Sequence, residues 1–138
     1  MAKKRAVKDI KVLFMDDDTR ICEIMRKHFD YIGYDAVIAV SGDEAVEMYR
    51  EELAAGRRFD IVVLDLAVKS GMGGVEAMRR ILEIDPSAAG IITSGNYLEP
   101  AMKNFKEFGF KAAFEKPFGF EEINDKILEL VKHKTADS

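Results

Sequence analysis

Four apolar runs of this sequence end in polar residues that could do chemistry together. These residues are Asp16, Asp17 and Asp18 after the first run, Asp65 after the second, Thr93 and Ser94 at the end of the third, and Lys116 after the fourth. Clustered carboxylates repel one another and need a counter-charge, which a hard cation such as Mg2+ supplies while taking oxygen ligands. An aspartate can also act as a nucleophile towards phosphorus, in a reaction that depends mainly on positioning and charge neutralisation. The residue types therefore indicate Mg2+-assisted phosphoryl transfer.

The elements that must position these residues alternate along the chain. Short apolar runs predict five strands, at 10–15, 35–40, 59–66, 88–94 and 111–116. Apolar residues at helical spacing predict five helices, at 19–33, 41–56, 75–84, 98–109 and 120–134. A βαβ series of this kind predicts an α/β fold with helices on both faces of a parallel sheet. We expect a flavodoxin-like, doubly wound (βα)5 architecture whose five strands lie in the order 2-1-3-4-5.

The predicted strand order decides which polar residues meet. The first and third strands are neighbours at the switch point of such a sheet, and ligands bind there at the carboxyl ends of the strands. Asp16, Asp17 and Asp65 should therefore form one cluster. Lys116 and the hydroxyl of Ser94 would face the anionic partner of the bound cation.

Four segments carry a resemblance to a known family. The segments FMDDD, DIVVLDL, IITSG and FEKPF occur in this order on the (βα)5 pattern. Each is weak alone, but together they resemble the receiver domain of two-component response regulators, and the resemblance covers residues 10–132. The variant is similar to the receivers of hybrid sensor histidine kinases, because the loop KSGMGG is one residue longer than usual.

The resemblance implies a role for each matching residue. Asp65 would be the phosphoacceptor, Ser94 the switch hydroxyl that hydrogen-bonds the phosphoryl group, and Lys116 the lysine that pairs with it. Metal ligation is implied for a further set: Asp16, Asp17, Asp65 and the main-chain carbonyl of Ala67, all holding Mg2+. The peptide bond between Lys116 and Pro117 is expected to be cis.

Several residues near these motifs have simpler interpretations. Asp18 is predicted to cap the first helix, because aspartate is among the best N-cap residues. Thr93 or Ser94 could supply the hydroxyl, and the 22-residue separation from Lys116 favours Ser94, with Thr93 as a packed strand residue. Packing or surface roles are expected for Cys22, His28 and His133.

The sequence departs from the family pattern at several positions. Lys69 stands where the family commonly has proline, and solvent exposure is expected for it rather than contact with phosphate. Ala113 stands where the family often has Tyr or Phe, so the usual aromatic switch is absent, and Phe114 or Tyr97 could substitute. Ala67 offers no side chain to shield a phosphoryl group. Together with Asn96, two residues past Ser94, it predicts ready access of water to the aspartyl phosphate.

Size and composition bound the remaining function classes. The chain has 138 residues, 33% of them charged, and a net charge of −4, which is typical of one globular domain and argues against a direct nucleic-acid binder. Its one cysteine excludes an intramolecular disulfide, and no apolar run is long enough to span a membrane, so we expect a cytoplasmic protein without direct membrane contact. The predicted domain is 9–134, between tails at 1–8 and 135–138.

The expected function is that of a switch or relay module. Its partners would be a sensor histidine kinase or histidine phosphotransfer protein and an unknown downstream protein, and it would catalyse only its own phosphorylation and dephosphorylation. No effector domain is expected, which leaves a stand-alone regulator or a piece of a hybrid kinase. The alternative is a pseudo-receiver that is not phosphorylated and serves as a protein-interaction adaptor. A phosphohydrolase or a flavin carrier on this fold fits less well, because the sequence offers neither a cap segment nor a phosphate-binding loop after the first strand.

Overall fold

Five parallel strands form the centre of the protein, in a computed structural model that describes residues 9–137 and side chains through Lys132. The strands are β1 (Lys11–Met15), β2 (Asp35–Ala39), β3 (Ile61–Asp65), β4 (Gly90–Ser94) and β5 (Ala112–Glu115). Their order is β2-β1-β3-β4-β5, which confirms the predicted doubly wound topology. Every residue of β3 and β4 is buried, as expected for strands covered on both faces.

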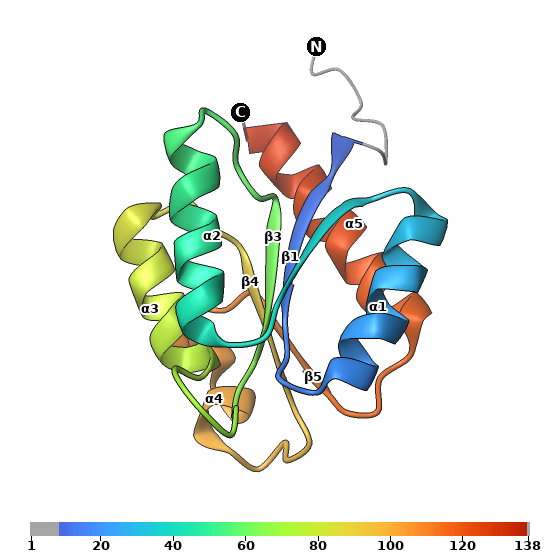
Figure 1. Cartoon of the computed structure of the whole chain (residues 1–138), viewed down its shortest axis with the longest axis vertical. Helices are drawn as coiled ribbons and strands as arrows, with labels where there is room; N and C mark the ends of the chain where they lie inside the picture. Colours follow the sequence, from blue (N-terminus) through green and yellow to red (C-terminus); the bar gives the residue numbers. More distant parts are fainter. Residues whose placement is uncertain (1–8, 138) are drawn as a thin grey trace.

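Helices cover both faces of this sheet (Figure 1). The helical elements are α1 (Thr19–Ile32), α2 (Gly42–Ala54), α3 (Gly74–Ile84), α4 (Pro100–Lys103), the 3-10 turn η2 (Phe105–Phe108) and α5 (Phe120–Asp137). One core cluster joins α2, α3 and η2 to the sheet through side chains such as Leu64 and Ile92. The other, called the α1/α5 cluster below, contains Phe14, Val63 and Ile91. Alternate residues of each strand thus belong to opposite layers.

The ends of α1 agree with the sequence interpretation. The carboxylate of Asp18 accepts a hydrogen bond from the Arg20 main-chain nitrogen, so the predicted N-cap is confirmed. Gly33 ends the helix with a φ of 101°, in the left-handed region that glycine adopts most easily. The Asp18 carboxylate therefore caps the N-terminus of α1.

The predicted helix over 98–109 is wrong in its extent. The structure has a single α-helical turn, α4, and then η2, separated at Asn104, whose φ and ψ of −118° and 43° are not helical. Phe105 and Phe108 both pack against the α2/α3 side of the core. Residues three apart share a face in a 3-10 turn, so this turn points both rings inward. Tertiary packing has overridden the helical propensity of the segment.

None of the helices among the described residues is both long enough and apolar enough to cross a membrane.

Candidate functional site

Strand ends position the candidate site at the carboxyl edge of the sheet. Asp16, Asp65 and Lys116 each come two residues after a side chain of the α1/α5 cluster. Those preceding side chains are Phe14, Val63 and Phe114. Because side chains two apart on a strand share a face, all three polar groups start from the same face of the sheet. Alternation along β1, β3 and β5 therefore brings them together.

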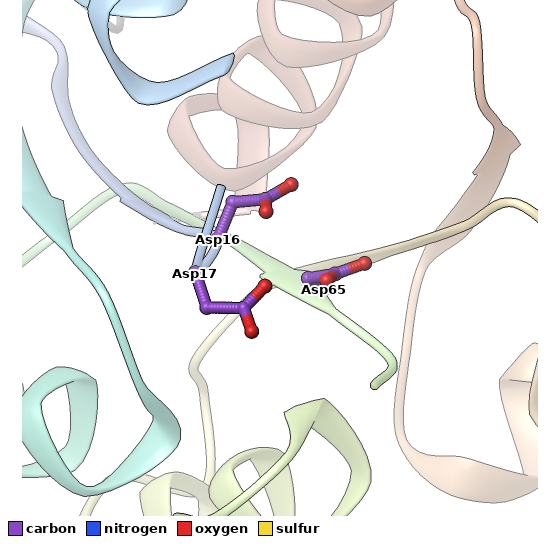
Figure 2. Close-up of side chains that lie close together, drawn as sticks. All are labelled: Asp16, Asp17 and Asp65. Carbon is purple, nitrogen blue, oxygen red and sulfur yellow. The ribbon is translucent and has the colours of Figure 1, made fainter. Parts of the chain in front are cut away.

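Three carboxylates meet at this edge. Asp16, Asp17 and Asp65 each offer one oxygen, and these oxygens lie within 4.8 Å of one another, so the predicted cluster is confirmed. Figure 2 shows the three side chains side by side at the ends of β1 and β3. Asp16 is 1% exposed and Asp65 is 5% exposed, whereas Asp17 is half-buried. A cluster of hard oxygen donors of this kind has the chemistry that Mg2+ requires.

Lys116 is the counter-charge that the folded chain itself supplies. Its Nζ lies 2.6 Å from Oδ2 of Asp16 and 3.0 Å from Oδ1 of Asp65. Among the residues that the structure describes, no other cation pairs with either carboxylate. One ammonium therefore faces three carboxylates, which leaves the site with an excess of negative charge.

This imbalance appears in the pKa values of the site. Burial, followed by the charge of Asp16, raises the pKa of Asp65 to about 6, against the opposing effect of Lys116. Burial lowers the pKa of Lys116, but its hydrogen bonds to Asp16 and Asp65 outweigh burial and leave the pKa above its usual value. Lys116 thus stays charged, while Asp65 is ionised only at a cost.

Backbone nitrogens hold one carboxylate oxygen each of Asp16 and Asp17. The main-chain nitrogen of Asp18 donates to Asp16 Oδ1 over 2.9 Å, and that of Lys69 donates to Asp17 Oδ2 over 2.7 Å. The Lys69 side chain is exposed, as predicted. The contact of its backbone with Asp17 was not predicted, because nothing in the local sequence indicates how the loop between β3 and α3 folds back.

That loop is also fastened to the start of α2. The nitrogen of Met72 donates to Asp43 Oδ2 over 2.9 Å, and the Met72 carbonyl accepts from the nitrogen of Gly42 over 2.7 Å. A Cβ at Gly42 would lie 2.5 Å from the same carbonyl oxygen, so only glycine permits this approach. Asp43 is therefore a residue of the site's surroundings that sequence reasoning missed.

The two hydroxyls at the end of β4 have different surroundings. Ser94 Oγ accepts a hydrogen bond from the Asn96 nitrogen over 3.0 Å, and within the described part of the chain it makes no hydrogen bond to Asp65 or Lys116. Thr93 is 1% exposed, so the prediction of a packed strand residue is confirmed. Its hydroxyl has no hydrogen-bond partner among the described residues.

Other predictions concern single residues around the site. The Lys116–Pro117 peptide bond is cis, as expected. Cys22 is a buried free thiol whose Sγ donates to the Asp16 carbonyl over 3.1 Å, and burial raises its pKa to about 11, which confirms a packed thiol. His28 stacks on Phe120 with ring centroids 4.2 Å apart, in a packing role. His133 lies outside the described side chains, and the role of the Ala67 carbonyl as a metal ligand stays a prediction.

Two hollows meet at Lys116. A pocket of about 390 Å³ is lined by Asp16, Asp17 and Lys116 together with the first turn of α1 and Lys69. An apolar groove of about 440 Å³ lies beside it and shares Ile21 and Lys116 with it. The groove runs between α1 and the segment 116–120, and Ile24 on its wall is 54% exposed. The site thus opens next to an exposed apolar surface.

Comparison with known proteins agrees with this geometry. The family model described as the response regulator receiver domain matches residues 12–128. Sporulation initiation phosphotransferase F of Bacillus subtilis is 30% identical over 125 residues, which cover 91% of this chain and 96% of that protein. Several other curated relatives are longer, and the chain spans about a quarter of their length, 27%.

Two solved structures have the same architecture. A CheY-like receiver domain protein from Methanospirillum hungatei superposes with a TM-score of 0.82 at 21% identity, covering 94% of this chain and 98% of that one. The CheX–CheY–BeF3–Mg2+ complex from Borrelia burgdorferi gives a TM-score of 0.78 at 25% identity, with 88% of each chain covered.

Proposed function

Because the chain belongs to the family of response regulator receiver domains, we propose that Asp65 accepts a phosphoryl group from a phosphohistidine in a Mg2+-dependent reaction. The donor would be a sensor histidine kinase or a histidine phosphotransfer protein. The observation that carries the proposal is the cluster itself, with Asp16, Asp17 and Asp65 within 4.8 Å and Lys116 3.0 Å from Asp65. The name of the Bacillus relative and the BeF3–Mg2+ complex of the Borrelia neighbour lend it support.

The residues divide the chemistry among them. A carboxylate oxygen of Asp65 would attack phosphorus, the P–N bond to histidine would break, and its electron pair would return to the imidazole nitrogen. With a pKa of about 6, Asp65 is ionised at pH 7.5, as a nucleophile must be. Asp16, Asp17, Asp65 and the Ala67 carbonyl would hold Mg2+, which when bound neutralises charge on the phosphoryl oxygens. Lys116 would turn from Asp16 to a phosphoryl oxygen.

The groove beside the site suggests how the donor approaches. A phosphohistidine can reach Asp65 only where the surface opens, and the pocket lined by Lys116, which pairs with Asp65, opens along the start of α1. The groove wall there is apolar and exposed at Ile24, so a donor with a matching apolar face would bury it on docking. We propose that the donor protein contacts α1 and the segment 116–120.

Ser94 and the loop that follows it would transmit phosphorylation of Asp65 to the protein surface. The Ser94 hydroxyl accepts from the Asn96 nitrogen and donates to the Asn96 carbonyl over 3.5 Å, and it would have to leave that carbonyl to donate to a phosphoryl oxygen. Glu115 Oε2 accepts a hydrogen bond from the Tyr97 nitrogen over 3.3 Å. A movement of the loop after Ser94 would therefore also move the exposed ring of Tyr97. Phe114 packs against Phe118 within the α1/α5 cluster, which makes Tyr97 the better substitute for an aromatic at position 113.

A direct measurement tests the proposal. The protein is incubated with acetyl phosphate and Mg2+, and its intact mass is measured. We expect the mass of one phosphoryl group to be added, and the addition to be lost with EDTA and in Asp65→Asn. Asp85→Asn is the matched control, because Asp85 is equally buried but lies away from the site, and it should still be phosphorylated. An unmodified wild-type protein would contradict the proposal and favour the adaptor function.

A further inference from the structure

Thr93 stands directly beside the proposed phosphoacceptor. In the parallel pairing of β3 and β4, the register partner of Asp65 is Thr93. The preceding pair on the same face, Val63 and Ile91, belongs to the α1/α5 cluster, so Asp65 and Thr93 start from one face as well. Neighbouring strands lie about 4.8 Å apart, so the two side chains adjoin, but in this structure the Thr93 hydroxyl makes no hydrogen bond to Asp65 and must rotate about the Cα–Cβ bond to reach its carboxylate.

The Thr93 hydroxyl is available to form a hydrogen bond with a neighbouring acceptor such as Asp65. Thr93 is 1% exposed, and its Oγ1 has no hydrogen-bond partner among the residues described. A buried hydroxyl without a partner is unfavourable, so it donates to an acceptor that comes within reach. The hydroxyl of Ser94, by contrast, accepts from the Asn96 nitrogen and donates to the Asn96 carbonyl. The end of β4 therefore carries one engaged and one unengaged hydroxyl.

We propose that the Thr93 hydroxyl donates a hydrogen bond to the Asp65 carboxyl group as the phosphoryl group leaves, and so shortens the lifetime of the phosphorylated state. The inference rests on the proposed function, since it concerns the loss of the phosphoryl group from Asp65. Thr93 would act on the departing carboxyl group, whereas the hydroxyl of Ser94 would bind the phosphoryl oxygen.

The chemistry of hydrolysis gives the hydroxyl its effect. Water attacks phosphorus, a new P–O bond forms, the bond between phosphorus and the Asp65 oxygen breaks, and its electron pair returns to the carboxylate. The products are the Asp65 carboxylate, inorganic phosphate and a proton. Negative charge therefore grows on the carboxyl group in the transition state, and a donor held beside it is worth more there than in the ground state. Removal of the donor should slow hydrolysis and raise the phosphorylated fraction at steady state.

Wild type and three variants are phosphorylated with acetyl phosphate and Mg2+, and the acetyl phosphate is then removed. The decay of the phosphorylated mass is followed at pH 7.5. Thr93→Val, which keeps the shape and removes the hydroxyl, should decay about fivefold more slowly than wild type, the factor expected for one hydrogen bond. Thr93→Ser keeps a hydroxyl and should decay within about twofold of wild type. Ile91→Val trims the same face one pair further from the site and should leave the decay unchanged.

The outcomes separate the inference from the proposed function. If wild type takes up no phosphoryl group, the proposed function fails and the inference fails with it. If wild type is phosphorylated but Thr93→Val decays at the wild-type rate, the inference alone is overturned. It is overturned as well if Thr93→Ser or Ile91→Val slows decay as much as Thr93→Val, because packing rather than the hydroxyl would then set the rate. Thermal melting of each variant reports whether the fold is intact.

Discussion

Two aspartates of this protein are almost equally buried, Asp65 at 5% exposed and Asp85 at 4% exposed, yet their pKa values move in opposite directions. Burial and the charge of Asp16 raise the pKa of Asp65 to about 6. Burial acts on Asp85 in the same sense, but hydrogen bonds from Tyr49 and Ser87 outweigh it and lower the pKa below its ordinary value. Desolvation therefore acts on both aspartates, and the neighbouring groups decide the direction in which each pKa moves.

The neighbours of Asp85 form a complete set. The Tyr49 hydroxyl donates to Oδ2 over 2.5 Å, and both the nitrogen and the hydroxyl of Ser87 donate to Oδ1. Arg58 Nε lies 3.1 Å from Oδ2. These donors belong to α2, to the turn before β4 and to the segment before β3, so Asp85 ties together elements at the amino edge of the sheet.

The hydrogen-bond donors around a buried carboxylate distinguish a structural role from a functional one. Asp85 is surrounded by donors and its charge stabilises the fold. Asp65 shares one ammonium with Asp16 and lies beside a third carboxylate, so its charge is unfavourable until a cation arrives. Electrostatic repulsion of this kind favours cation binding, because the bound cation relieves it. Four experiments test this contrast between Asp65 and Asp85.

The largest effect is expected from removal of the one ammonium. Lys116→Met keeps the length of the side chain but leaves Asp16 and Asp65 buried without a counter-charge, so the free energy of unfolding at pH 7.5 without Mg2+ should fall by about 3 kcal/mol. Urea denaturation measures it. Lys126→Met is the control, since Lys126 pairs with Glu129 at the surface and should change stability by less than about 0.5 kcal/mol. Equal losses in the two variants would remove the contrast.

Neutralising Asp65 should have the opposite sign. The folded-state pKa of Asp65 lies above its unfolded value, so its ionisation destabilises the native state above pH 6, and this penalty disappears as the pH falls from about 6 towards 4. Asp65→Asn without Mg2+ should therefore raise the free energy of unfolding by about 2 to 3 kcal/mol at pH 7.5, with little gain at pH 4. Urea denaturation at several pH values measures the gain. A loss of stability at pH 7.5 would contradict the assignment of Asp65 as an unfavourable charge.

The same substitution at Asp85 should destabilise. Asp85 has a lowered pKa, so its charge stabilises the fold above its ordinary pKa, and that contribution is lost as the pH falls through the folded-state value. Asp85→Asn should cost about 1 to 2 kcal/mol at pH 7.5, since half-exposed Arg58 adds little and the hydrogen bonds from Tyr49 and Ser87 lose their charge-assisted strength. Thermal melts in the same buffers as for Asp65→Asn measure the cost. Stabilisation by both substitutions would show that burial alone governs the two sites.

The sequence predicts one half of this contrast far better than the other. Asp16, Asp65 and Lys116 could be placed together because each ends a strand, and parallel topology brings carboxyl ends to one edge. The partners of Asp85 come from positions such as Tyr49, 36 residues away, and no periodicity links them. The break at Asn104 was missed for the same reason, since it follows from how Phe105 and Phe108 pack. The contact of the Lys69 nitrogen with Asp17 likewise depends on a loop path that only the fold defines.

Mg2+ should act on one region and leave the other untouched. At about five times its dissociation constant, Mg2+ should raise the free energy of unfolding by about 1 kcal/mol, and Asp85→Asn should show the same gain. Asp17→Ala should lose the gain, because Asp17 offers one of the three clustered carboxylate oxygens.

Asp17 also accepts from the Lys69 nitrogen, so the substitution loosens a loop as well as removing a ligand. Asp43→Ala separates the two effects, because Asp43 accepts from the Met72 nitrogen of the same loop but lies outside the cluster. Thermal melts with and without Mg2+ should therefore show the gain kept in Asp43→Ala and lost in Asp17→Ala. Loss in both variants would mean that Mg2+ stabilises the protein through loop order rather than through the carboxylates.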